Sequence, residues 1–258
     1  MRIMISPAKK MNEDLDGLPP SGLPVLLEET ERLLTYLRGL ALPELKKLLA
    51  CNDQLADLNY RRYQSMDLRE RLTPALLAYE GIQYRYMAPA VFSQSALDYV
   101  QEHLRILSGF YGVLRPFDGV TPYRLEMQAK LRTDFCKDLY DFWGGKLAEA
   151  LSPDGAVIDL ASGEYSRAVV PHLPAGTRVV TPVFGELRSD GKVVEKGVHV
   201  KMARGEMVRF LAEGRIEDPE DIVDFEGLHF RYCRQRSQPD RPVFLRDVEK
   251  KADGVKFR

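Results

Sequence analysis

Residues 104–132, LRILSGFYGVLRPFDGVTPYRLEMQAKLR, combine basic, aromatic, glycine and proline residues in one short stretch. Glycine or proline recurs in it at positions 109, 112, 116, 119 and 122. Because these residues interrupt helices and strands alike, we predict an extended, shaped loop. A long loop within a compact domain is often functional, so we expect this one to line a site.

The same stretch combines positive charge with aromatic rings. Five basic residues stand against two acids, Asp118 and Glu126. Four aromatic residues alternate with the arginines: Phe110, Tyr111, Phe117 and Tyr123. A guanidinium beside an aromatic face can hold a phosphate while the ring stacks on a base. The alternative is structural, with the arginines paired to the two acids and the rings in the core.

The composition of the whole chain limits the class of protein. The 258 residues, 45% of them hydrophobic, suffice for one sizeable core, so we predict a single domain over residues 1–258. A formal net charge of −1 gives no overall attraction to a polyanion, so an anion site needs local clustering. The three cysteines form no CxxC motif, and no signal peptide or membrane-spanning run is present. We therefore expect a cytoplasmic protein without a membrane partner.

The hydrophobic patterns alternate between strand and helix along the chain. Strands are predicted at residues 2–6, 157–160, 178–183 and 193–200, the last beside a turn at Asp190 and Gly191. The predicted helices cover residues 26–40, 43–49, 53–63, 69–79, 96–108 and 201–212. The predicted fold is α+β, with a mixed sheet flanked by helices, and we expect residues 231–258 to be partly mobile.

Three further segments are candidates for chemistry. Lys9 comes just past the first strand, and Ser162 follows the strand at 157–160, where α/β sheets commonly bind ligands. Lys201 and Arg204 lie three residues apart, hence on one face of a helix, and a solvated amphipathic face explains them equally well. Residues 43–63 predict a helix-hairpin-helix-like element, although the turn lacks the usual glycines and an ordinary helical hairpin is the more frequent explanation.

Some chemistries are disfavoured by the spacing of residues. Ser162 lacks the preceding glycine of a G-x-S-x-G elbow, which argues against a serine hydrolase. The histidines and cysteines show no metal-ligand spacing. We expect no metal and no cofactor.

Four segments together resemble a known family: SPAK at residues 6–9, the central motif at 104–127, IDLASGEY at 158–165 and KMARGEMVRF at 201–210. Their order and spacing are similar to those of the YaaA family of bacterial peroxide-stress proteins. The resemblance implies a cytosolic protein that limits peroxide damage to DNA and proteins by lowering unincorporated iron. It also implies a mixed α/β fold with a positively charged cleft and a helix-hairpin-helix element that binds DNA.

The motif positions imply which residues form that cleft. The expected nucleic-acid or anion-binding residues are Lys9, Arg105, Ser108, Tyr111, Arg115, Tyr123, Arg124, Ser162, Lys201 and Arg204. The expected partner is DNA, either duplex or distorted and partly single-stranded, held by phosphate contacts and stacking. The protein is expected to be a monomer.

A second hypothesis is an enzyme that acts on a nucleobase, a nucleotide or a damaged DNA site, in the manner of a glycosylase or lyase. The same cleft is rich in acid and base groups, which is unusual for a simple binding protein. The catalytic candidates are Lys9, Asp118, Glu126, Glu164 and Tyr165. A third possibility, direct iron chelation, is disfavoured by the lack of ligand spacing.

Overall fold

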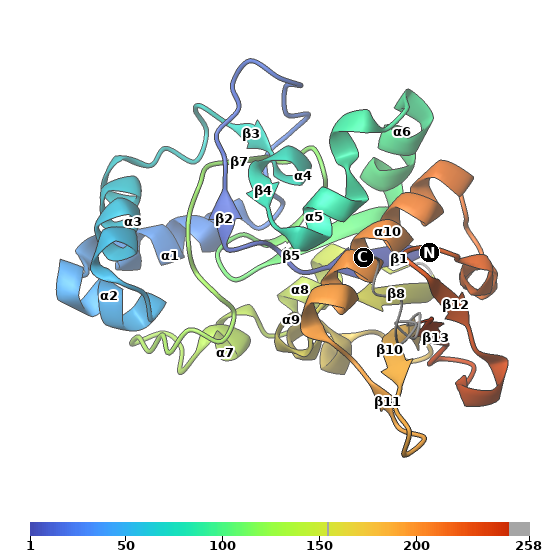
Figure 1. The fold of residues 1–258 in the computed structure, drawn as a ribbon. Helices are drawn as coiled ribbons and strands as arrows, with labels where there is room; N and C mark the ends of the chain where they lie inside the picture. Colours follow the sequence, from blue (N-terminus) through green and yellow to red (C-terminus); the bar gives the residue numbers. More distant parts are fainter. Residues whose placement is uncertain (154, 248–258) are drawn as a thin grey trace, which may run out of the picture.

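A five-stranded sheet forms the centre of the computed structural model, which describes residues 1–153 and 155–247 (Figure 1). Its strand order is β6-β5-β1-β8-β9, with β1 at Arg2–Ile5, β5 at Leu104–Ser108, β6 at Gly112–Leu114, β8 at Ala156–Leu160 and β9 at Arg178–Val180. Strands β5, β1, β8 and β9 are parallel, and β6 pairs antiparallel to β5 at the edge. Ile3, Met4 and Ile5 are fully buried, as the continuous apolar run of a central parallel strand requires.

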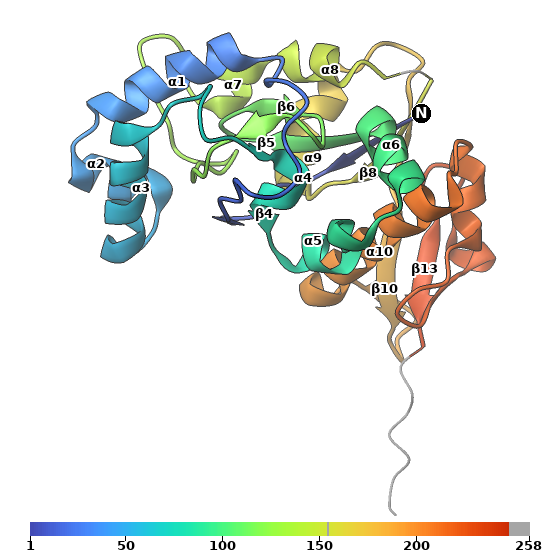
Figure 2. The ribbon, with the colours of Figure 1, turned by 90° about the horizontal axis from the view of Figure 1, so that it is seen from above.

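A second sheet lies at one end of the molecule (Figures 1 and 2). Its order is β11-β10-β13-β12, with β10 at Val183–Leu187, β11 at Val193–Val194, β12 at Phe230–Tyr232 and β13 at Val243–Arg246. Phe184, Phe225, Phe230 and Phe244 are fully buried and contact one another ring to ring. Two short pairs complete the strands: β2 (Lys10–Met11) with β4 (Tyr79–Glu80), and β3 (Thr73–Pro74) with β7 (Gly119–Val120).

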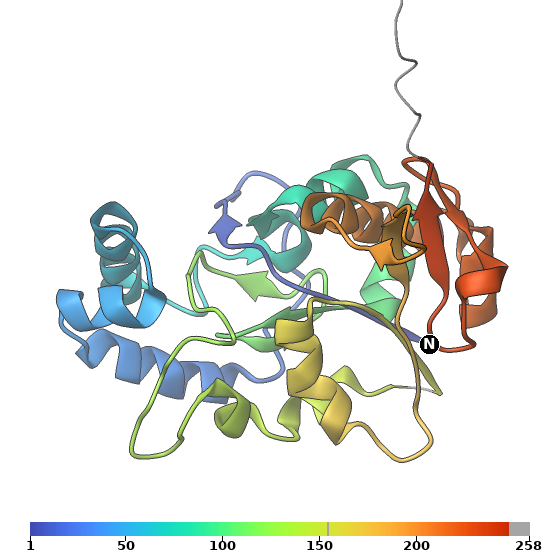
Figure 3. The same cartoon turned by 60° about the horizontal axis from the view of Figure 1, so that its bottom comes forward.

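Helices cover both faces of the five-stranded sheet (Figures 2 and 3). One layer contains α1 (Leu27–Gly39), α7 (Leu139–Trp143), α8 (Lys146–Leu151) and α9 (Gly163–Val169). The other contains α4 (Ala75–Ala78), α5 (Ile82–Met87), α6 (Gln94–His103) and α10 (Gly197–Gly214). Helix α1 buries residues 27, 30, 33, 34 and 37, the spacing of one helical face.

Helices α5 and α10 approach each other closely at Gly205. A Cβ atom at this position would lie 2.2 Å from the Gln83 carbonyl oxygen and 2.9 Å from the Met87 amide nitrogen. Glycine is therefore needed there for two helices to pack, because any side chain would force them apart. This contact fixes the positions of Gln83 and Arg204 relative to each other.

Helices α2 (Leu42–Leu49) and α3 (Asp53–Ser65) form the predicted helical hairpin, at the opposite end from the second sheet (Figures 1 and 2). Ala50 ends α2 in the left-handed conformation, and the Asn52 side chain accepts a hydrogen bond from the Leu55 amide to cap α3. Lys46 pairs with Asp53 and Arg61 pairs with Asp57, so both of these cations are engaged within the hairpin.

The predicted α+β fold class, a mixed sheet core flanked by helices, is confirmed. Several local predictions were wrong. The expected loop at 104–132 contains β5, β6 and β7, and residues 104–108 form a strand instead of extending the helix predicted over 96–108. The helix predicted over 69–79 is reduced to α4 between short strands, and residues 197–200 begin α10 instead of ending a strand.

The predicted mobile tail began at residue 231. Residues 231–247 include parts of β12 and all of β13, which pair within the second sheet, and the rest of the tail lies outside the described residues. Among residues 1–153 and 155–247, none of the helices is both long and apolar enough to traverse a bilayer.

Candidate functional site

Three serines meet at the carboxyl edge of the parallel strands. Ser6 directly follows β1, Ser108 is the last residue of β5, and Ser162 lies between β8 and α9. The Ser162 amide donates to Ser6 Oγ at 2.8 Å, and the two hydroxyl oxygens are 3.2 Å apart. This edge is where parallel sheets place ligand sites, because helices and loops begin there.

A cavity of about 470 Å³ opens at this edge. We call it the Lys9 pocket. It is lined by Ser6, Pro7, Ala8, Lys9, Lys10, Glu80, Gly81, Ile82, Gln83, Tyr84, Tyr123, Arg124, Leu125, Glu126, Ser162, Glu164, Tyr165, Lys201 and Arg204. The segment that follows β1, helix α5, the central motif, and helices α9 and α10 therefore contribute to one cavity. The volume is that of a small-molecule or single-nucleotide site.

The Lys9 pocket has an excess of positive charge. Its lining includes five basic side chains, those of residues 9, 10, 124, 201 and 204, against three carboxylates, those of residues 80, 126 and 164. Glu126 bridges two of the cations: one oxygen lies 2.9 Å from Lys9 Nζ and the other 2.9 Å from Arg124 Nη2. Lys201 has no ion-pair partner in the part of the chain that the structure describes.

Three buried donors on residues that line this pocket have no partner. Within the described ranges, Gln83 Nε2, Arg124 Nε and Arg204 Nε are buried nitrogens without a hydrogen bond. A buried N–H group without an acceptor costs about 1–3 kcal/mol. All three atoms are closed off from solvent, so they lie behind the cavity surface and leave the charged ends of Arg124 and Arg204 as the parts of those side chains that can face a ligand.

The buried carboxylate of Asp159 interacts electrostatically with Arg204. Asp159 is 3% exposed; it accepts hydrogen bonds from the Ser166 hydroxyl and, at 2.9 Å, from the Ala161 amide. Burial raises the pKa of Asp159, and the Arg204 charge opposes that shift. Burial lowers the pKa of Arg204, which the Asp159 charge partly restores. The two charges therefore attract each other at the back of the pocket, although they form no ion pair among the described residues.

Two acidic groups on α9 face the same cavity. Burial raises the pKa of Glu164, and repulsion from Glu126 adds to that rise. The hydrogen bond from the Gln128 amide acts in the opposite direction but does not cancel it. Tyr165 is 6% exposed, and burial is the largest cause of its raised pKa. A carboxyl group with a raised pKa in a pocket is suited to hold or transfer a proton.

Three of the four aromatic residues of the central motif pack in the core, as the structural alternative predicted, and the fourth, Phe117, is half-buried. Phe110 and Tyr111 are fully buried, and Tyr123 is 4% exposed, with its ring 5.0 Å from that of Phe110 and 5.3 Å from that of Tyr111. The Tyr123 hydroxyl is 2.6 Å from Ser108 Oγ, and the Tyr111 hydroxyl is 3.0 Å from Thr121 Oγ1. Ser108 and Tyr111 thus support Tyr123 from behind the pocket wall and do not face the cavity.

The structure divides the predicted site residues between two cavities. Arg105 and Arg115 line a second cavity, of about 530 Å³, which we call the Arg105 pocket. Arg105 is the second residue of β5 and Ser108 is the last, so the two pockets lie near opposite ends of that strand. The remaining predicted residues that line the Lys9 pocket are Lys9, Tyr123, Arg124, Glu126, Ser162, Glu164, Tyr165, Lys201 and Arg204.

Asp118 lines neither pocket. It is 5% exposed; its Oδ2 accepts a hydrogen bond from the Arg115 amide at 2.8 Å, and its own amide donates to the Arg115 carbonyl at 3.1 Å. Burial raises the pKa of Asp118 to about 6, against that hydrogen bond and the charges of Arg115 and Arg105. Its position supports a role in the turn before β7 and gives it no direct contact with the Lys9 pocket.

Several pocket residues were not predicted from the sequence. Gln83 and Tyr84 come from α5, and the Tyr84 hydroxyl donates to the Ser6 carbonyl at 3.0 Å. No motif marks α5 in the sequence, so only its packing against α10 brings it to the site. In the described residues, His, Cys, Asp and Glu side chains form no group of three or more that could hold a metal ion.

Comparison with known proteins shows that relatives match nearly the whole chain. Residues 1–236 match the family described as "Peroxide stress protein YaaA". A UPF0246 protein of Desulfitobacterium hafniense is 56% identical over 252 residues, which is 97% of this chain and 100% of that protein. UPF0246 proteins of Lachnoclostridium phytofermentans and Pediococcus pentosaceus are 50% and 49% identical, covering 95% and 96% of this chain and 96% and 98% of their own lengths.

Proposed function

Because the chain belongs to the YaaA family of peroxide stress proteins, which assigns it a role in peroxide stress, we propose that it fulfils this role by binding DNA through the Lys9 pocket. The observation that carries the proposal is the gathering of five cationic side chains, against three carboxylates, in one cavity at the carboxyl ends of the parallel strands. Phosphate and base oxygens are acceptors, and phosphate also carries the complementary charge.

The size of the pocket selects the form of DNA. A cavity of about 470 Å³ has room for one nucleotide unit and not for a duplex. The bound DNA is therefore distorted or partly single-stranded, with one unit in the pocket and its neighbours along the rim. The buried rings of Phe110 and Tyr111 take no part in stacking, so affinity comes mainly from phosphate contacts.

Binding of fluorescently labelled oligonucleotides by the wild type and matched variants tests this proposal. Lys201→Gln removes an exposed pocket cation and should weaken binding of single-stranded or gapped DNA about 3- to 10-fold, as loss of one phosphate contact implies. Arg188→Gln removes an exposed cation next to the β10–β11 hairpin, away from both pockets, and should leave affinity unchanged. Equal losses in both variants would indicate non-specific attraction and count against the pocket.

The helical hairpin α2–α3 is a second possible DNA contact, and we propose that it contributes little. Its cations Lys46 and Arg61 already pair with Asp53 and Asp57, and its turn has no glycine. Ion pairs within the hairpin would have to be exchanged for phosphate contacts, which reduces the net gain.

An enzyme that acts on a nucleobase or damaged DNA site is the second candidate function. It is favoured by the raised pKa of Glu164 next to Lys9, Glu126 and Tyr165 in a pocket of single-nucleotide size. A nucleophilic Lys9 would first have to leave the Glu126 carboxylate, 2.9 Å away. Borohydride trapping with abasic, uracil-bearing and oxidised-base duplexes should yield a covalent adduct at Lys9 that Lys9→Gln abolishes. No adduct or product with any of them would leave DNA binding as the function.

We further propose that any effect on intracellular iron is indirect, that the protein acts as a monomer, and that it works in the cytoplasm. The iron proposal rests on the lack of a suitable ligand group within residues 1–153 and 155–247. Equilibrium dialysis against ferrous ion should then show no stoichiometric binding, and one tightly bound ion per chain would overturn it.

A further inference from the structure

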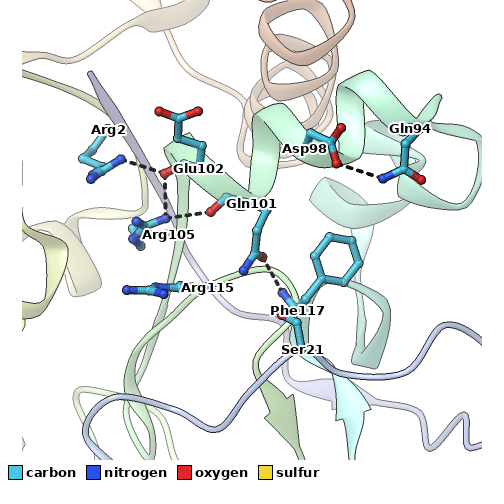
Figure 4. Close-up of a pocket in the computed structure, with 9 residues that line it drawn as sticks. All are labelled: Arg2, Ser21, Gln94, Asp98, Gln101, Glu102, Arg105, Arg115 and Phe117. Atoms are coloured by element: carbon cyan, nitrogen blue, oxygen red, sulfur yellow. Dashed lines mark hydrogen bonds between the residues drawn. The ribbon is translucent and has the colours of Figure 1, made fainter.

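The Arg105 pocket lies at the amino ends of β1 and β5, away from the Lys9 pocket. Its lining consists of Arg2, Ser21, Gln94, Asp98, Gln101, Glu102, Arg105, Arg115 and Phe117. The guanidinium groups of Arg2, Arg105 and Arg115 lie in a row on one side of the cavity, and Asp98 and Phe117 lie on the other (Figure 4). Three cations from separate segments of the chain thus converge here.

Two of these arginines have a structural explanation. Arg2 Nη1 donates to the Glu102 carbonyl at 2.7 Å, and Arg105 Nη1 donates to the carbonyls of Gln101, Glu102 and Leu104 (Figure 4). These carbonyls end helix α6, whose carboxyl terminus attracts positive charge. Helix capping therefore explains part of the placement of the Arg2 and Arg105 guanidinium groups. It does not explain why the exposed Arg115 side chain lies beside them.

The three guanidinium charges are not neutralised by carboxylates. No ion pair of Arg2, Arg105 or Arg115 occurs among the residues that the structure describes. Arg105 is 6% exposed, and its pKa is lowered to about 10, first by burial and then by repulsion from Arg2 and Arg115. Bringing like charges together in a partly buried site is unfavourable unless an anion compensates them.

The nearby acids compensate these charges only in part: Asp118 and Glu102 attract the Arg105 charge, but neither forms an ion pair with an arginine of this pocket within the described residues. The Asp98 carboxylate accepts a hydrogen bond from Gln94 at 2.8 Å, across the cavity from the arginines (Figure 4). The Glu102 side chain is 72% exposed. Asp118 interacts electrostatically with Arg105, but its Oδ2 accepts from a backbone amide and its side chain lies outside the lining.

We propose that the Arg105 pocket is a second anion site, which binds the phosphate group of a nucleotide-like ligand. The phosphate lies against Arg105 and Arg115, since guanidinium groups bind phosphate oxygens with paired, charge-assisted hydrogen bonds. The half-buried Phe117 ring lies across the cavity beside Asp98, where it can contact the apolar or planar remainder of a ligand that spans the pocket. A free nucleotide and a phosphate of bound DNA share this chemistry.

Calorimetric titration with AMP and with inorganic phosphate tests the proposal in the full-length chain. The wild type should bind AMP, and Arg115→Gln should weaken that binding about tenfold or more, because one charge-assisted contact is lost. Arg115 is exposed and its side chain makes no hydrogen bond within the described ranges, so the variant should retain the wild-type melting temperature. Arg115→Lys should recover part of the affinity.

Two controls separate this site from the Lys9 pocket. Lys201→Gln should bind AMP as the wild type does, whereas Arg188→Gln should change neither AMP nor DNA binding. Competition by a single-stranded oligonucleotide for AMP would identify DNA as the source of the phosphate, and no competition would identify a free nucleotide. Lack of AMP and phosphate binding by the wild type, or equal affinity in Arg115→Gln, would overturn the second site and leave DNA binding at the Lys9 pocket untouched.

Discussion

The Lys9 pocket and the Arg105 pocket lie at opposite ends of the same parallel strands and attract anions in different ways. In the Lys9 pocket, Glu126 holds Lys9 and Arg124 in place, and buried donors on α5 and α10 lack acceptors. In the Arg105 pocket, backbone carbonyls of α6 hold two guanidinium groups, and no carboxylate within the described residues pairs with them. The first site depends on helix packing, and the second depends on the end of one helix.

The largest expected effect comes from separating α5 and α10, which should damage only the Lys9 pocket. Gly205→Ala places a Cβ atom 2.2 Å from the Gln83 carbonyl, so the free energy of unfolding should fall by about 3 kcal/mol. DNA affinity should fall with it, while AMP binding to the Arg105 pocket persists. Chemical denaturation gives the stability change. Gly39→Ala is the control, since a Cβ there meets nothing within 4 Å and should not reduce stability. Equal stability of the two variants would contradict the packing argument.

A smaller expected effect is the pH dependence of the free energy of unfolding that Asp118 contributes in the turn beside the Arg105 pocket. The pKa of Asp118 is raised from 3.8 to about 6, so the folded chain binds more protons than the unfolded chain between these values. Its contribution to stability is therefore greatest at low pH and declines as pH rises through about 6, by about 2 kcal/mol. Asp118→Asn should remove this decline. Denaturation of both proteins from pH 4 to 7 measures the difference in slope, and parallel curves would show that Asp118 does not titrate there.

Neutralising Glu126, which pairs with both Lys9 and Arg124, should change DNA binding at the Lys9 pocket alone. Glu126→Gln frees Lys9 and Arg124 from their shared carboxylate, so DNA affinity should rise about threefold at low salt. Glu149→Gln, which neutralises an exposed acid of α8 that lines neither pocket, is the matched control and should leave DNA affinity unchanged. A loss of affinity in Glu126→Gln would mean that the carboxylate itself contacts the DNA.

The smallest effect is expected at the helical hairpin. Lys47 is exposed on α2 and forms no ion pair among residues 1–153 and 155–247. Lys47→Gln should change DNA affinity less than twofold if the pocket dominates binding. A loss as large as that of Lys201→Gln, measured in the same assay, would make the hairpin an equal partner.

Strong periodicity made several elements predictable. The strand expected at 2–6 is β1 at Arg2–Ile5, and the helix expected at 26–40 is α1 at Leu27–Gly39, because apolar residues recur there with one clear period. Residues 96–108 show why other predictions were wrong. The run through Leu104, Ile106 and Leu107 is apolar without a distinguishing period, so a buried strand was taken for a helix.

The family resemblance assigned Arg105 and Ser108 to one cleft by motif position, and the misassigned strand hid the fact that they lie beside two different pockets. With residues 104–108 in a helix or loop, Arg105 and Ser108 belong to one site; with them in β5, they lie near opposite ends of a strand. Lys9 and Ser162 were predictable because each follows a strand that the sequence marks clearly. Gln83 was not, since its place depends on the contact of α5 with Gly205, a feature of packing that leaves no local pattern.

The salt dependence of DNA affinity tests the central claim most directly. If the Lys9 pocket and its rim neutralise about four phosphates of single-stranded DNA, the logarithm of the association constant should fall against the logarithm of salt concentration with a slope of about −3. Lys201→Gln should reduce that slope by about 0.7, and Arg188→Gln should reproduce the wild-type slope. A flat salt response of the wild type, or identical slopes for all three proteins, would contradict phosphate binding in this pocket.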